Sequence, residues 1–202
     1  MQQVSSFQLD VLNEIGNIGA GNAATALSLL MGSPVDMTLP WTKFCPLEEG
    51  CALLSRPDEV GVGVQVGLDG SVTGRMLLTF DEASALHILL AFGDMLPEKD
   101  LDNEMARSAL MEVGNIVAGS FVTALSEFLK ASAWCSPPTL VHDYFDAFVC
   151  TVMVSGCQDT DYVLVFKTEL QVGGKVLHSD LAFMPAEDSF RMIMNALGAT
   201  GG

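Results

Sequence analysis

The chain repeats itself once, and this repeat constrains the fold more than any other feature of the sequence. The segment EIGNIGAGNAATALS (residues 14–28) has a counterpart, EVGNIVAGSFVTALS (residues 112–126), placed 98 residues later. At this single offset the two copies share, without a gap, Glu14 and Glu112, Gly16 and Gly114, Asn17 and Asn115, Ala20 and Ala118, Gly21 and Gly119, and the final Thr-Ala-Leu-Ser. Pro40 and Pro138 fall on each other at the same offset. A repeat this long marks two related half-molecules rather than a solenoid of short units.

Each half is predicted to run helix, strands, helix. Apolar residues recur at helical spacing through the first copy, from a cap at Ser5 or Ser6. A second long helix is expected from a cap at Asp100 or Asp102 to about Lys130. Strands are expected at residues 61–68 and 71–80 around an Asp69-Gly70 turn, at residues 146–156, 161–170 and 175–184 with turns near Asp159 and Gly173-Gly174, and closing helices at about residues 82–92 and 187–197.

Short turns between neighbouring strands predict an antiparallel sheet rather than a parallel one. We therefore expect an α/β fold with approximate two-fold symmetry, in which an antiparallel β-sheet packs against two long repeated helices. Residues 1–202 are interpreted as one domain built of two homologous halves, about 1–98 and 99–202, because the helices of one half alone would lack a surface against which to bury their apolar sides.

Charge and composition argue against several partner classes. The chain has 25 acidic and 9 basic residues, so its field repels phosphates and opposes binding to nucleic acid or anionic membrane surfaces. No apolar run reaches the roughly 18 to 20 residues that span a bilayer, and the first ten residues do not resemble a signal peptide. Together with five cysteines in no C-x-x-C pair, this predicts a soluble cytoplasmic protein with free thiols and no membrane insertion.

Metal and nucleotide sites are the weaker interpretations. The three histidines have no metal-ligand spacing to the cysteines; His142 and Asp143 with Asp146 could form a metal site, but a solvated loop is the simpler reading. The GNIGAG segment lacks the spacing of a phosphate-binding loop, and the segment before it is predicted to be helical. Its second glycine, Gly19, is replaced by Val117 in the second copy.

A stripe of polar and small residues is predicted along one face of each long helix, because its members are three or four residues apart. The stripe comprises Asp10, Glu14, Asn17, Gly21, Thr25 and Ser28 in the first copy, and Ser108, Glu112, Asn115, Gly119, Thr123 and Ser126 in the second. An ordinary solvated helix face explains one such stripe. It does not explain why a glutamate and an asparagine persist in both copies while neighbouring positions have diverged.

A glutamate and an asparagine form no nucleophilic triad, but they suit one kind of chemistry. An amide both donates and accepts hydrogen bonds, so it can hold a water molecule in line with a phosphorus atom. A carboxylate one helical turn away can pair with a cation on a phosphorylated partner. Such a site is incomplete alone, since it would insert into another protein's active site and leave the metal and the electrophile to that partner.

The pattern [Asp or Ser]-x3-Glu-x2-Asn with a proline 23 residues after the asparagine resembles the signature of the CheC/CheX/FliY phosphatases of chemotaxis. Asp10, Glu14, Asn17 and Pro40 meet it, and Ser108, Glu112, Asn115 and Pro138 meet it again. The resemblance covers most of the chain, and the two-copy layout is similar to that of the CheC branch. It implies a CheC-like fold, with two long pseudo-symmetric helices against a β-sheet.

The resemblance also implies an activity. A protein of this family hydrolyses the aspartyl phosphate of the response regulator CheY. By analogy Glu14 and Glu112 would pair with the regulator's lysine, and Asn17 and Asn115 would orient the hydrolytic water. Asp10, Gly21, Ser108 and Gly119 would lie on the docking surface. The Mg²⁺ would belong to the regulator, so no cofactor or metal is expected on this chain, and the receptor deamidase CheD is the expected regulatory partner.

Two other functions stay open. The first is a binding protein that sequesters phosphorylated CheY or regulates CheD with little turnover. The second is a structural subunit of the flagellar motor switch. The relative contribution of the two Glu-x-x-Asn pairs and the position of a CheD interface are not determined by the sequence.

Overall fold

The computed structural model describes residues 4–96, 98–156 and 161–199. The first half contains α1 (Ser6–Met31), β1 (Val35–Pro46), α2 (Leu47–Leu54), β2 (Val60–Gly70), β3 (Gly74–Asp81), α3 (Glu82–Ala91) and the short 3-10 helix η1 (Gly93–Met95). The second half contains α4 (Glu104–Leu129), β4 (Ala133–Cys135), β5 (Thr139–Tyr144), α5 (Phe145–Gly156), β6 (Tyr162–Val172), β7 (Lys175–Pro185) and α6 (Glu187–Ala199).

One antiparallel sheet holds strands from both halves. Its order is β1-β6-β7-β3-β2, and both β4 and β5 pair with β2 at the far edge. Thus β1 of the first half pairs with β6 of the second, and β4 and β5 of the second half pair with β2 of the first. This exchange confirms the predicted antiparallel α/β architecture and the pseudo-two-fold relation of the halves.

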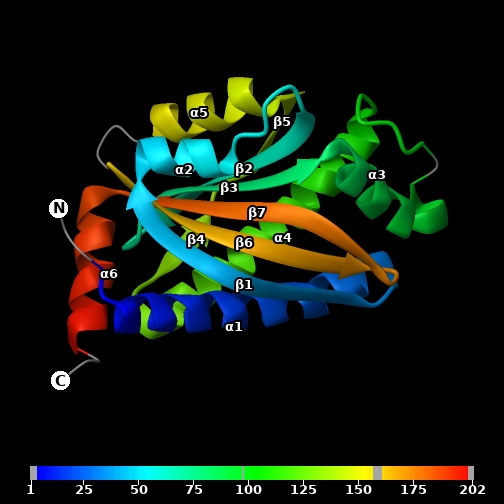
Figure 1. Ribbon diagram of the computed structural model, residues 1–202. Helices are drawn as coiled ribbons and strands as arrows, with labels where there is room; N and C mark the ends of the chain where they lie inside the picture. Colours follow the sequence, from blue (N-terminus) through cyan, green and yellow to red (C-terminus); the bar gives the residue numbers. More distant parts are fainter. Residues whose placement is uncertain (1–3, 97, 157–160, 200–202) are drawn as a thin grey trace.

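The sheet lies between two helical layers (Figure 1). The long helices α1 and α4 cover one face, α2 and α5 cover part of the other, and α6 stands at one end. The main core lies between the long helices and the sheet and includes Leu27, Leu110, Phe121, Phe166 and Phe183. A smaller core under α2 and α5 is built around Phe145, Phe148 and Met153. Burial of these apolar surfaces supplies most of the stabilisation.

Local signals start and stop the long helices. Ser5 caps α1 as predicted, in a capping box with Gln8, and Gly32 ends it in the left-handed conformation. The predicted cap of α4 at Asp100 or Asp102 is wrong. Asn103 takes that role, because its side chain accepts hydrogen bonds from the backbone N–H groups of Met105 and Ala106.

The structure corrects one strand prediction. Residues 146–156 belong to helix α5, in which Phe145, Phe148, Val149, Val152 and Met153 are buried. Those positions follow helical spacing, but a short, almost wholly apolar run hides its period among further apolar residues. The predicted β6 and β7 and their turn at Gly173 and Gly174 are confirmed, whereas the turn expected near Asp159 lies outside the described residues.

Several elements were not predicted. They are β1, the short helices α2 and η1, and the edge strands β4 and β5. The β2–β3 hairpin is confirmed, but its strands pair as far as Leu68 with Gly74, so the reversal includes residues 71–73 rather than Asp69-Gly70 alone.

Helix α4 is long and apolar enough, by length and composition alone, to cross a membrane. Its apolar residues are used inside the fold: Leu110, Val113, Val117, Phe121 and Leu125 are all buried in the main core. The composition of α4 is thus that of a helix with one side against a sheet and a second helix at its flank.

The two long helices approach each other closely at a glycine. A Cβ atom added to Gly19 would lie 2.9 Å from the Cα atom of Phe121 on α4. Gly21, on the outer side of α1, has nothing within 4 Å of such an atom. The different residues at equivalent positions, Gly19 in one copy and Val117 in the other, are therefore explained by packing rather than by binding of a phosphate.

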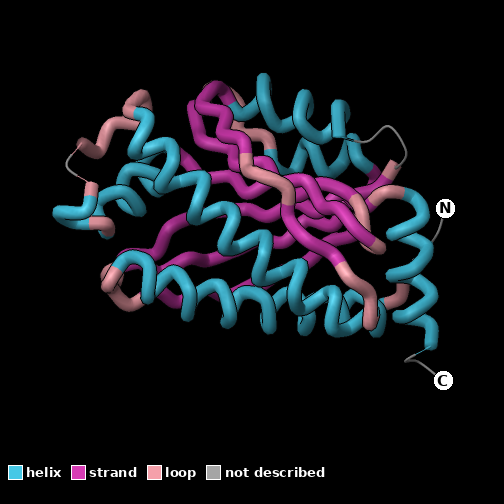
Figure 2. The backbone as a smooth tube through the Cα atoms, turned by 180° about the vertical axis from the view of Figure 1, so that it is seen from behind, coloured by secondary structure: helices cyan, strands magenta, loops and turns pink. Residues whose placement is uncertain are grey.

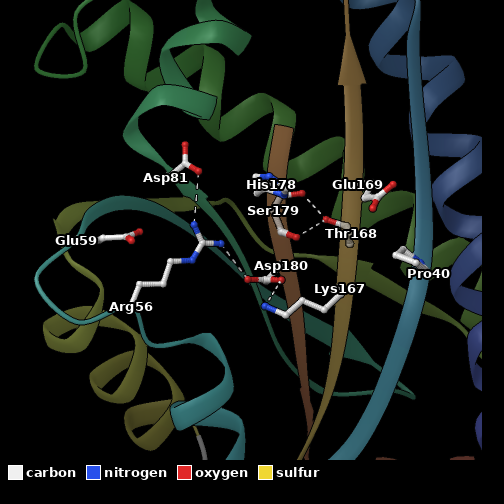
Figure 3. Close-up of a pocket in the computed structure, with 10 residues that line it drawn as sticks. All are labelled: Pro40, Arg56, Glu59, Asp81, Lys167, Thr168, Glu169, His178, Ser179 and Asp180. Atoms are coloured by element: carbon white, nitrogen blue, oxygen red, sulfur yellow. Dashed lines mark hydrogen bonds and ion pairs between the residues drawn. The ribbon is translucent and has the colours of Figure 1, made fainter. Parts of the chain in front are cut away.

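Part of the second sheet face is not covered by helices and forms an open polar pocket of about 540 Å³ (Figure 3). Asp180 lies at its floor with a side chain only 2% exposed. One of its carboxylate oxygens is 2.9 Å from Lys167 Nζ and the other is 3.2 Å from Arg56 Nη2. Arg56 also lies 3.5 Å from Asp81, which caps α3, and its guanidinium stacks over the ring of Phe145.

Free thiols were predicted for all five cysteines, and the four described ones are free. Cys45 and Cys51 are buried, and Cys157 lies outside the described residues. Burial raises the pKa of Cys45 to about 11 and also raises the pKa of Cys135. Both thiols are therefore poor nucleophiles near neutral pH.

The glycine contact gives a matched pair of substitutions. Gly19→Ala should lower the unfolding free energy, because forcing a methyl group against the Phe121 backbone costs about 1–3 kcal/mol, more than the helix-propensity gain of about 1 kcal/mol. Gly21→Ala should raise it by up to about 1 kcal/mol. Urea denaturation measures both, and equal stabilities for the two variants would contradict the close approach.

The buried carboxylate gives a second prediction. Asp180→Asn should lower the unfolding free energy by about 1–3 kcal/mol, because a neutral amide pairs less strongly with Lys167 and Arg56 than the buried carboxylate does. The control is Glu49→Gln, which removes the solvent-exposed ion pair with Lys43 and should change the stability much less. Thermal denaturation of both variants at one salt concentration tests the difference; comparable losses would argue against a structural role for Asp180.

Candidate functional site

The predicted stripe of α1 lies on the outer face of the helix. Asp10, Glu14, Gly21 and Thr25 are exposed, whereas Asn17 and Ser28 are half-buried. The stripe of α4 has the same character: Ser108, Glu112 and Thr123 are exposed, and Asn115, Gly119 and Ser126 are half-buried. Each glutamate therefore stands beside its asparagine at the surface, one helical turn away on the same face.

The two glutamates are available for a partner. Within residues 4–96, 98–156 and 161–199, neither Glu14 nor Glu112 has an ion-pair partner. Gly21 and Gly119 follow one turn after the asparagines, and an added Cβ atom at either would meet nothing within 4 Å. Each stripe is thus an open surface with a free carboxylate, on which another backbone can approach closely.

Most hydroxyl groups of the stripes are bonded to their own helices, whereas the Oγ atom of Ser126 is buried and has no hydrogen-bond partner among the described residues. Thr25 and Thr123 donate to the carbonyl oxygens of Gly21 and Gly119, four residues before them on the same helix, and Ser108 donates to Glu104 in the same way. These bonds turn the side chains back onto their own helices. The glutamate and the asparagine are therefore the stripe's chemically informative groups.

Asn17 is held by two hydrogen bonds. Its Nδ2 donates to the carbonyl oxygen of Asn13 at 3.0 Å, and its Oδ1 accepts from the backbone N–H of Leu39 at 3.3 Å. Asn13 in turn accepts a hydrogen bond from Thr42 Oγ1 at 2.6 Å. The amide is thus tied both to its own helix and to the edge strand β1.

A β-bulge in β1 supplies the N–H that Asn17 accepts. Thr38 pairs with Glu169 and Trp41 pairs with Lys167, so Leu39 and Pro40 together face a single residue of β6. A bulge leaves an N–H outside the ladder, and Asn17 satisfies that of Leu39. Pro40 has no N–H to lose and is compatible with this interruption of an edge strand.

The second copy has the same interruption at the opposite edge of the sheet. Between the pairs Met37–Leu170 and Trp41–Lys167, three residues of β1 face two of β6. Between the equivalent pairs Cys135–Leu68 and Thr139–Gln65, three residues of the β4–β5 segment face two of β2. The signature prolines Pro40 and Pro138 thus mark one structural position in both halves.

The two asparagines nevertheless have different surroundings. Pro137 stands 98 residues after Leu39, at the equivalent position of the interruption, and proline has no backbone N–H. Within the described part of the chain, the side chain of Asn115 makes no hydrogen bond. Helix α4 is tied to its edge strand instead by Arg107 Nη2, which donates to the carbonyl oxygen of Leu140 at 3.2 Å.

The long helices lie side by side across one sheet face, as the view from behind shows (Figure 2). Asn17 contacts β1 at one sheet edge, whereas α4 contacts β5 at the other. The two Glu-x-x-Asn pairs therefore lie on separate helices toward opposite edges of the sheet and do not converge on one cleft.

The structure favours neither a phosphate-binding loop nor a metal site among the described residues. The GNIGAG segment lies inside α1 and forms no phosphate-binding loop. Among the described residues no group of three or more His, Cys, Asp and Glu side chains could hold a metal ion. His142 faces Glu82, with its Nε2 2.9 Å from the carboxylate. In the polar pocket beside β6 and β7, the buried carboxylate of Asp180 pairs with Arg56 and Lys167. These ion pairs connect the loop between α2 and β2 to the sheet.

Sequence reasoning missed the groups that position the asparagine. A backbone N–H carries no residue signature, so Leu39 could not be singled out. The available signal was the proline 23 residues after each asparagine, which marks a break in a strand although it does not show what the freed N–H contacts.

Comparison with known proteins identifies the family of the chain. A model described as the CheC-like family matches residues 7–40, and one described as the chemotaxis phosphatase CheX matches residues 62–144. The CheY-P phosphatase CheC of Bacillus subtilis is 30% identical over 198 residues, which cover 96% of this chain and 95% of that protein.

Solved structures share the fold. The crystal structure of Thermotoga maritima FliY matches with a TM-score of 0.78 at 23% identity, over 98% of this chain and 99% of that one. A complex of CheX with CheY, BeF3 and Mg²⁺ from Borrelia burgdorferi matches with a TM-score of 0.50 at 22% identity, over 84% of this chain and 96% of that one. With a relative 30% identical along nearly its entire length, the chain belongs to the CheC/CheX/FliY family of chemotaxis phosphatases.

Proposed function

We propose that this protein hydrolyses the aspartyl phosphate of a CheY-type response regulator with its two Glu-x-x-Asn pairs. The observation that carries the proposal is the recurrence, on both long helices, of an exposed glutamate beside an asparagine, with no ion-pair partner for the glutamate in the described part of the chain. The named activity of the Bacillus subtilis relative supports the choice of substrate. The CheX–CheY complex, in which a protein of similar fold is bound to the regulator, supports the choice of partner.

In the proposed encounter, the stripe of α1 or α4 docks against the regulator's phosphorylation site. Glu14 or Glu112 pairs with the regulator's lysine, as a charge-assisted hydrogen bond that orients the two proteins. Gly21 and Gly119 leave room for the regulator's backbone. The Mg²⁺ that neutralises the phosphoryl oxygens belongs to the regulator.

The asparagine amide has one task in this mechanism. It holds a water molecule opposite the bond between phosphorus and the aspartate oxygen, so that attack proceeds in line. The water oxygen bonds to phosphorus, the bond to the aspartate oxygen breaks, and the products are the free carboxylate and inorganic phosphate. Asn17 retains atoms for this task, because an amide has two N–H donors and two oxygen lone pairs and only one of each is used.

The sites lie at opposite edges of the sheet, so each serves one regulator molecule in this proposal. Regulation by CheD remains a further part of the proposal, which rests on the family resemblance alone. The competing function is a binding protein that sequesters phosphorylated CheY or regulates CheD with little turnover.

Replacement of both amides separates catalysis from sequestration. The double variant Asn17→Ala with Asn115→Ala should lose on the order of 10²-fold or more in the rate of phosphate release from phosphorylated CheY with Mg²⁺, because the attacking water is no longer positioned. Its affinity for the regulator should change little. The matched control is Asn195→Ala, which removes an exposed amide of α6 outside both stripes and should retain the wild-type rate. A wild-type rate in the double amide variant would favour the binding function.

Replacement of both carboxylates tests the docking role. Glu14→Gln with Glu112→Gln should weaken regulator binding by about 10- to 100-fold, since a hydrogen bond between charged groups contributes about 1.5–3 kcal/mol. Titration calorimetry with a phosphoryl-analogue form of CheY measures this. The control Glu127→Gln removes an exposed carboxylate of α4 outside the stripe and should leave the affinity unchanged, so an equal loss in both would indicate a nonspecific charge effect.

A further inference from the structure

We infer that the backbone N–H of Leu39 is a positioning group for Asn17, and that the second copy lacks this device because Pro137 stands in its place. The inference rests on the proposed function and adds to it a difference between the two sites. Asn17 is a pre-positioned amide, whereas Asn115 must be ordered by the regulator each time it binds.

The hydrogen bonds of Asn17 carry the first step. Rotation of the amide is restrained at both of its polar atoms, by Asn13 on the same helix and by Leu39 on β1. An amide that is fixed before docking presents its remaining donor and acceptor in one orientation. Pre-positioning of this kind lowers the entropy cost of the reactive arrangement.

The strand register carries the second step. Leu39 and Pro137 both lie in an interruption where three residues face two, flanked by pairs that match at the same offset. Leu39 and Pro137 are therefore equivalent by their position in the strand pairing and not only by their alignment in the sequence. At one of them an N–H is present and bonded, and at the other the residue type removes it.

The residues around Asn17 and Asn115 differ in the same sense as their hydrogen bonds do. In the first half the side chains of Asn13 and Thr42 form a further bond between α1 and β1 beside the held amide. In the second half Met111 replaces Asn13 and Leu140 replaces Thr42. The link between α4 and β5 is made instead by Arg107, which donates to the carbonyl oxygen of Leu140.

The two sites can be measured one at a time. Asn115→Ala leaves only the first site, and Asn17→Ala leaves only the second. In the Asn115→Ala protein, Leu39→Pro removes the N–H together with the leucine side chain, while Leu39→Ala removes the side chain and keeps the N–H. The comparison of these two variants therefore isolates the N–H from the loss of packing against Gly16.

Phosphate release from phosphorylated CheY with Mg²⁺ is the kinetic readout. We expect kcat of the first site to be about 2- to 10-fold lower in Leu39→Pro than in Leu39→Ala, with KM unchanged within about twofold. Equal kcat values, or a higher value in Leu39→Pro, would overturn the positioning role. In the Asn17→Ala protein, Pro137→Leu should raise kcat of the second site, and an unchanged or lower kcat would count against the inference.

A spectroscopic readout is independent of turnover. In NMR spectra of the full chain, the side-chain NH2 signals of Asn17, identified by their loss in Asn17→Ala, should exchange with solvent more slowly than those of Asn115. Leu39→Pro should speed this exchange and Leu39→Ala should not. If the wild-type protein releases no phosphate, the proposed function fails while this measurement still decides whether Leu39 holds Asn17; equal exchange in both Leu39 variants would refute the holding.

Discussion

The packing of two long helices against a sheet shared by both halves is the constraint on which the rest of the structure depends. Neither half has a complete sheet, because β1 pairs with β6 and the β4–β5 segment pairs with β2. The helices bury their apolar sides on this common sheet and meet where Gly19 lies under the backbone of Phe121. Their opposite sides are thereby fixed outward, and those sides carry the Glu-x-x-Asn pairs.

Symmetry and its failures have separate physical origins. The register of the edge strands is the same in both halves, including the interruption at Pro40 and Pro138. The interior differs where the two long helices meet. Gly19 of α1 leaves room for the backbone of Phe121 on α4, whereas Val117, the counterpart of Gly19 in the second copy, carries a buried side chain. The surface differs at the asparagines, since one edge strand offers a backbone N–H and the other offers a proline. A duplicated sequence has thus produced two similar Glu-x-x-Asn pairs whose asparagines are held differently.

Much of the architecture could be predicted because its signals are local and periodic. Ser5 is a capping residue in a recognisable context, and the alternation and turn residues of β6 and β7 identify a hairpin. The prediction of a strand at residues 146–156 was wrong, because a run that is apolar at almost every position shows neither helical nor strand periodicity. The edge elements β1, β4 and β5 and the helix α2 were overlooked, since each owes its conformation to pairing or packing with a segment distant in the sequence.

The sequence by itself determined that the chain is a duplicated α/β molecule and which glutamate and asparagine recur on its helices, because a repeat and a helical spacing are visible without coordinates. Only the tertiary structure decided that the two pairs lie toward opposite sheet edges. It also decided that, among the described residues, the glutamates have no ion-pair partner and Asn17 is held by hydrogen bonds while the Asn115 side chain makes none. The physical reason is that the deciding partner of Asn17 is a main-chain N–H, 22 residues away along the chain. A bulge in a strand, rather than any side chain, brings that donor to the helix.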